Sequence, residues 1–120
     1  MLRVIRFEIN ADQPERAVKF YSEVFGWKIQ KWEGPMDYWL VYTGEGLGID
    51  GGLAKRETPS ATTINTVGVP SVDEYLAKIE KSGCKVVMPK VALPGIGWSA
   101  NCQDTEGNVF VIMQEDSSAR

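Results

Sequence analysis

The sequence predicts an α+β domain built from two tandem βαβββ modules. Three observations support this: an alternating strand pattern near the N-terminus, a helix pattern with end signals directly after it, and the return of the same order of elements in the second half. The first module is expected over residues 1–55 and the second over 62–116, joined by a linker at 56–61. A chain of 120 residues is in the usual size range for one domain.

The first module begins with a strand over residues 4–10, in which apolar and polar side chains alternate. A helix should follow, since Asp12 can act as the N-cap, Pro14 suits the first turn and Glu15 completes a capping-box spacing. Gly26 is expected to end this helix in the left-handed conformation. Three further strands are predicted, over residues 27–32, 38–42 and 47–54.

The second module repeats this order. A strand over 63–69 precedes a second capping box, Ser71 with Glu74, and Gly83 is expected to end the second helix as Gly26 ends the first. Strands are predicted at 85–87, 98–103 and 108–114, with a loop at 89–97.

Composition narrows the possible functions. The 13 basic and 16 acidic residues are spread along the chain without a basic cluster, which argues against a nucleic-acid partner. Apolar runs fall short of the ~20 residues that span a bilayer, and the N-terminus is not typical of a signal peptide. Cys84 and Cys102 are expected to be free thiols, so the sequence indicates a cytoplasmic protein that does not act on membranes.

Several short motifs resemble the vicinal oxygen chelate superfamily, which includes glyoxalase I, extradiol dioxygenases and bleomycin-resistance proteins. The similarity covers almost the whole chain, and its motifs are the residues at 7–9, 12–17, 20–21, 24–27, 69–72, 83 and 104–108. The resemblance implies that the two modules form an open eight-stranded half-barrel with the helices outside and a ligand on the concave face. Most of these residues cap or pack elements, so they specify the fold more than the activity.

The resemblance also implies four positions where metal-dependent relatives place ligands. They fall on Arg6, on Asp50, on Ile64 or Asn65, and on Val111. Only Asp50 offers a carboxylate, and the chain has no histidine, whereas zinc requires three or four N, O or S ligands. We therefore expect no metal and no other cofactor, although a divalent metal remains the alternative.

Arg6 and Glu8 are the leading chemical candidates, because they share one strand face opposite the expected helix side. Arg6 could bind an anionic ligand while Glu8 orients it or acts as an acid or base, which makes Glu8 the candidate catalytic residue. The alternative is a simple ion pair that lines a wet cavity or forms a dimer contact.

Aromatic residues are the second candidate feature. On the strand at 38–42, Tyr38 and Tyr42 share one face with Leu40, and Trp39 and Val41 share the other, but the pattern does not decide which face meets a ligand. An aromatic cavity would suit a flat organic molecule, while core packing is the alternative. The predicted ligand-binding set is Arg6, Glu8, Tyr38, Tyr42, Asp50, Trp98 and Val111.

Three functions are consistent with these features. The first is metal-free binding of a small organic molecule, the second is a lyase, isomerase or dioxygenase-type enzyme with a carboxylate acid or base, and the third is a non-catalytic interaction module. The resemblance further implies a homodimer.

Overall fold

The structure, a computed structural model, describes residues 2–120 and contains two compact units. The N-terminal unit is Arg6–Ile64, and the C-terminal unit is Asn65–Arg120 together with residues 2–5. No helix among the described residues is long and apolar enough to span a membrane.

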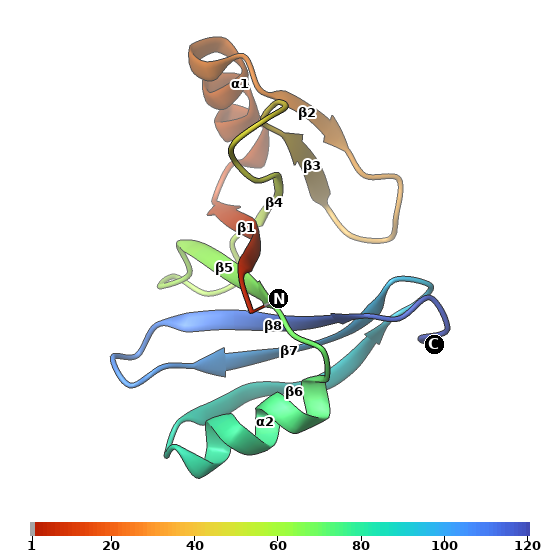
Figure 1. Cartoon of the computed structure of the whole chain (residues 1–120). Helices are drawn as coiled ribbons and strands as arrows, with labels where there is room; N and C mark the ends of the chain where they lie inside the picture. The colour runs from red at the N-terminus through yellow and green to blue at the C-terminus, as the bar shows by residue number, and fades with distance from the viewer. Residues whose placement is uncertain (1) are drawn as a thin grey trace. The chain divides into compact units, whose positions relative to one another are not determined.

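The N-terminal unit places one helix against four strands (Figure 1). The strands are ordered β2-β3-β4-β1; β1 runs parallel to β4, and the other neighbours are antiparallel. The elements are β1 (Val4–Ala11), whose first two residues belong to the C-terminal unit, α1 (Pro14–Phe25), β2 (Lys28–Lys31), β3 (Tyr38–Tyr42) and β4 (Gly51–Lys55).

The C-terminal unit has the same order of elements, and Figure 1 shows its helix running along its strands. The strand order is β5-β8-β7-β6, with β5 parallel to β8. The elements are β5 (Thr63–Gly68), whose first two residues belong to the N-terminal unit, α2 (Val72–Lys81), β6 (Lys85–Leu93), β7 (Gly97–Gln103) and β8 (Val109–Glu115). The predicted α+β class with two βαβββ modules is therefore confirmed.

Each helix covers one face of its sheet. In the N-terminal unit, Val41 and Leu53 are buried, and Phe7 and Ile9 of β1 pack with them against Ala17, Val18 and Tyr21 of α1. Because side chains alternate along a strand, Arg6, Glu8, Tyr38, Leu40 and Tyr42 occupy the opposite face. We call this surface the open face of the N-terminal unit.

The C-terminal unit is built in the same way. Ala100, Cys102 and Ile112 of the strands are buried beneath α2, where Val72 of the helix is buried with them and Tyr75, Leu76 and Ile79 pack against the same cluster. Cys84 and Cys102 are free thiols, as the sequence predicts. The open face of this unit carries Thr66, Ser99, Asn101, Val111 and Met113, which stand in register across β5, β8 and β7.

The predicted Asp12 capping box is wrong. Gln13 is the N-cap of α1 and makes no side-chain capping bond, because the Asp12 carboxylate instead accepts a hydrogen bond from Arg56 Nε at 2.9 Å. The Ser71 cap is confirmed, since Ser71 Oγ accepts from the backbone N–H of Glu74 at 3.1 Å. Gly26 ends α1 in the left-handed conformation, as predicted, with φ of 71°.

Two strand boundaries also differ from the prediction. The strand expected over 47–54 begins only at Gly51, because Gly44, Gly46 and Gly48 adopt positive φ and make the preceding segment a loop. β6 continues through Pro89 to Leu93 instead of ending before a loop. Proline is tolerated there because the pairing of β6 with β7 shifts register between Val86 and Val91, and β6 pairs on one side only within its unit.

Candidate functional site

A bridge of two hydrogen bonds joins Arg6 to Glu8 through Tyr38. Arg6 Nη2 donates to Tyr38 Oη at 2.9 Å, and Tyr38 Oη donates to Glu8 Oε2, also at 2.9 Å. Arginine has no acceptor, so the phenol oxygen must accept from Arg6 and direct its own proton to Glu8. The simple ion pair that the sequence left open does not form, since no ion pair of Arg6 occurs within residues 2–120.

Gly52 makes this bridge possible. Tyr38 lies on β3 and Glu8 on β1, with β4 between them, and Gly52 of β4 is the residue paired with Glu8. A Cβ atom at Gly52 would overlap the phenol oxygen and ring of Tyr38. The phenol therefore crosses β4 in the space that a side chain would otherwise fill.

The bridge lies in a partly desolvated setting. Burial raises the pKa of Glu8 above its ordinary value of 4.5, while the Tyr38 hydrogen bond and the Arg6 charge oppose this rise. Burial and the neighbouring Glu8 charge raise the pKa of Tyr38 to about 12, so its phenol stays neutral at physiological pH. Tyr38 can therefore donate to Glu8 and accept from Arg6 at the same time.

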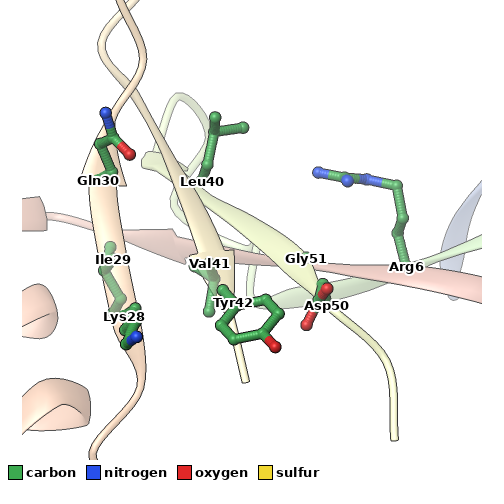
Figure 2. A pocket seen from close by; sticks show the side chains of 9 residues that line it. All are labelled: Arg6, Lys28, Ile29, Gln30, Leu40, Val41, Tyr42, Asp50 and Gly51. Carbon is green, nitrogen blue, oxygen red and sulfur yellow. The ribbon is translucent and has the colours of Figure 1, made fainter. Parts of the chain in front are cut away.

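A hollow of about 420 Å³ lies beside the bridge in the N-terminal unit. In Figure 2 the Arg6 guanidinium points toward the strand that carries Leu40. Leu40 and Tyr42 are 44% and 41% exposed, so apolar and aromatic surface is open to a ligand. The hollow is lined by Arg6, Lys28, Ile29, Gln30, Leu40, Val41, Tyr42, Asp50 and Gly51.

Charge in the hollow favours an anion. Arg6 and Lys28 line it, and neither is ion-paired with any residue between 2 and 120. Asp50 is the single carboxylate in the lining, and its Oδ1 accepts from the backbone N–H of Thr43 at 2.9 Å and from the Thr43 hydroxyl at 3.2 Å. The lining thus contains two positive groups and one carboxylate, which already closes the loop from Thr43 to Asp50, while the Glu8 carboxylate is joined to Arg6 through Tyr38 outside the lining.

The residues at the four expected metal positions do not fit a metal. Arg6 carries a positive charge, Val111 has no donor atom, and the Asp50 carboxylate is bonded to Thr43. Asn65 alternates with the buried Thr66, so it points to the same side of β5 as Val67, which packs under α2. Residues 2–120 contain no group of three or more His, Cys, Asp or Glu side chains able to hold a metal ion.

The predicted ligand set divides between the units. Arg6, Glu8, Tyr38, Tyr42 and Asp50 all lie in the N-terminal unit, which brings the first three into one hydrogen-bonded bridge.

Trp98 and Val111 belong to the C-terminal unit. The Trp98 indole N–H donates to Asp116 at 3.0 Å, and Lys90 Nζ stands 4.6 Å from the ring centroid. Val111 is half-buried on β8, in register with Thr66 and Asn101.

Sequence reasoning missed Lys28, Leu40 and Gly52 as site residues. Leu40 could have been found from its shared face with Tyr38 and Tyr42. Gly52 gives no local signal of its role, because its importance arises from pairing with Glu8, which is 44 positions earlier in the chain.

Two units with the same βαβββ order of elements define a paired-module domain. The sequence profile of the Glyoxalase/Bleomycin resistance protein/Dioxygenase superfamily matches residues 3–112. The chain belongs to this superfamily, and the resemblance seen in the sequence is confirmed.

A curated relative agrees with this assignment, and solved structures share the fold. A glyoxylase-like domain-containing protein of Didymella fabae is 30% identical over 112 residues, which cover 88% of each chain. A superfamily member from Vibrio splendidus has a TM-score of 0.70 at 17% identity and covers 96% of this chain and 100% of its own. A methylmalonyl-CoA epimerase variant of Streptomyces coelicolor, in complex with 2-nitronate-propionyl-CoA, has a TM-score of 0.73 at 14% identity and covers 100% and 99%. At these identities the solved structures show the shared fold.

Proposed function

We propose that the chain binds a small organic anion in the hollow of the N-terminal unit, and that it does so without a metal. The observation that carries this proposal is the Arg6 guanidinium, which lines the hollow and forms no ion pair within residues 2–120. A guanidinium that spends one N–H on Tyr38 keeps four more N–H groups, and these can bind a carboxylate or phosphate through two parallel hydrogen bonds.

The lining supports an amphipathic ligand. Leu40 and Tyr42 offer apolar and aromatic contact, and Lys28 supplies a second positive charge. A ligand with an anionic group and a flat apolar body would satisfy both parts of this surface. Independence from metal follows in this proposal from the donor chemistry of Arg6, Asp50 and Val111.

A second candidate function is proton transfer by Glu8. Its carboxylate is partly desolvated, its pKa is raised, and only Oε2 accepts from Tyr38, which leaves Oε1 for a ligand. Glu8 does not itself line the hollow, so this function requires a ligand that reaches past Arg6 to the carboxylate, which could then remove or return a proton. Replacement of Glu8 by Gln should then abolish proton transfer to and from the bound anion, while naphthoate binding persists.

Calorimetric titration of chelator-treated protein tests the binding proposal. The probe is 2-naphthoate, and 2-naphthamide is the matched neutral ligand with the same ring system. We expect 2-naphthoate to bind at least about tenfold more tightly, because a charge-assisted contact to Arg6 contributes more than about 1.4 kcal/mol. Addition of Zn²⁺ or Mn²⁺ should leave the affinity unchanged.

Two results would contradict the proposal. Equal affinity for the acid and the amide would mean that charge plays no part in recognition. Binding that appears only after a divalent metal is restored would show that the ligand is held through that metal.

A further inference from the structure

Gly52 and Tyr38 of the N-terminal unit lie next to Arg6 and have no direct part in the proposed anion site. Gly52 is buried beneath the Tyr38 phenol, and it stands in register with Glu8 on one side and Leu40 on the other. The hollow itself is lined by neither Gly52 nor Tyr38. A role for these two residues must therefore act through Arg6, which contacts Tyr38 and also lines the hollow.

We propose that Gly52 and Tyr38 are positioning residues that orient the Arg6 guanidinium for anion binding. Gly52 leaves room for the phenol above β4, and the phenol holds Nη2 of Arg6 in place. This inference rests on the proposed function, because it concerns how that same site recognises its anion.

The hydrogen-bond geometry explains why Tyr38 should favour anion binding by Arg6. The Tyr38 hydroxyl has one proton, which Glu8 Oε2 accepts, so its oxygen is left to accept from Arg6. A flexible arginine side chain loses about 1.5–2 kcal/mol of rotamer entropy when it is ordered. Tyr38 holds Arg6 ordered before the anion arrives, so less of this entropy is lost on binding.

Trp32 also helps to hold the Tyr38 ring in this position. Its ring meets the Tyr38 ring edge-on, with centroids 6.2 Å apart. The phenol is therefore held by a ring contact and by two hydrogen bonds, and Gly52 is the residue whose enlargement would displace it.

The test uses the full chain with three changes: Gly52→Ala, Tyr38→Phe and Tyr38→Leu. Both Gly52→Ala and Tyr38→Phe should weaken 2-naphthoate binding about three- to tenfold, in proportion to one lost hydrogen bond of about 0.5–1.5 kcal/mol. Leucine lacks the three phenol atoms that a Cβ at position 52 would meet. In the Tyr38→Leu background, Gly52→Ala should therefore change the affinity no further.

A readout without ligand separates this inference from the proposed function. In ¹H–¹⁵N spectra, the Arg6 guanidinium protons should exchange slowly in the wild-type chain and rapidly in both Gly52→Ala and Tyr38→Phe. If the wild-type chain fails to bind naphthoate, the proposed function is wrong. The role of Gly52 and Tyr38 in anion binding is then wrong as well, even if this exchange pattern appears.

If the wild-type chain does bind naphthoate, two results would still overturn the inference about Gly52 and Tyr38. The first is wild-type affinity and wild-type guanidinium exchange in Gly52→Ala. The second is an equal loss of affinity on Gly52→Ala in the wild-type and Tyr38→Leu backgrounds, since Gly52 would then act by a route that does not involve the phenol. Thermal unfolding of each variant distinguishes these results from loss of the fold.

Discussion

The open faces of the two units share an architecture and differ in chemistry. In the N-terminal unit, β1 and β3 present Arg6, Glu8 and Tyr38, linked by hydrogen bonds. In the C-terminal unit, the corresponding strands β5 and β7 present the buried Thr66 and Ser99, beside Val111 of β8. The same module can therefore carry different chemical groups on its open face, because the helix-covered core lies on the other side of the sheet.

The two cores should matter equally for folding, whatever their open faces carry. Leu53→Ala in β4 and Ile112→Ala in β8 each remove a large buried side chain, so each should lower the free energy of unfolding by about 2–5 kcal/mol. Urea denaturation measures both values. A loss below about 1 kcal/mol for either variant would contradict the assignment of that residue to a close-packed core.

Removal of the Arg6 charge should affect binding more than stability. Arg6→Met should weaken 2-naphthoate binding by at least about tenfold, since a charge-assisted contact is lost. Arg16→Met is the matched control, because Arg16 is exposed on α1 and does not line the hollow. Equal affinities for the two variants in calorimetry would show that the charge of the open face is not used.

The two helix starts provide a smaller contrast. Ser71→Ala should lower the free energy of unfolding by about 1 kcal/mol, because the backbone N–H of Glu74 loses its acceptor. Gln13→Ala should have little effect, because Gln13 makes no side-chain cap bond. Denaturant titration measures the free energy of unfolding of both variants. A larger loss for Gln13→Ala than for Ser71→Ala would contradict the conclusion that only Ser71 caps its helix through its side chain.

Glu8 should give the chain a pH dependence that Glu8→Gln lacks. Because burial raises the pKa of Glu8 in the folded state, the folded chain binds its proton more tightly than the unfolded chain does. The contribution of Glu8 to stability is then fully present below pH 4.5, the ordinary value, and is lost as the pH rises through the folded-state value. The stability of wild type relative to Glu8→Gln should fall over this window, and a constant or rising difference in urea titrations would contradict the desolvation of Glu8.

Local patterns predicted the fold well, because strand alternation and helix caps depend on neighbouring residues. The exceptions show the competing interactions: Asp12 bonds Arg56 across 44 positions instead of capping α1, and Asp50 closes a turn with Thr43 instead of extending a strand. The open face could be predicted only in part. Alternation placed Arg6 with Glu8 and Tyr38 with Tyr42, but the Tyr38 bridge depends on the pairing of β4 with β1 at Gly52, which no short stretch of sequence encodes.

The most direct test of the account is to map bound 2-naphthoate by ¹H–¹⁵N chemical-shift changes in metal-free protein. We predict saturable shifts that are concentrated at the backbone amides of Arg6, Leu40, Tyr42 and Gly51, with none of comparable size on the open face of the C-terminal unit. Shifts centred on Thr66, Ser99 and Val111, or no saturable shifts at all, would contradict the claim that the charged open face of the N-terminal unit is the binding surface.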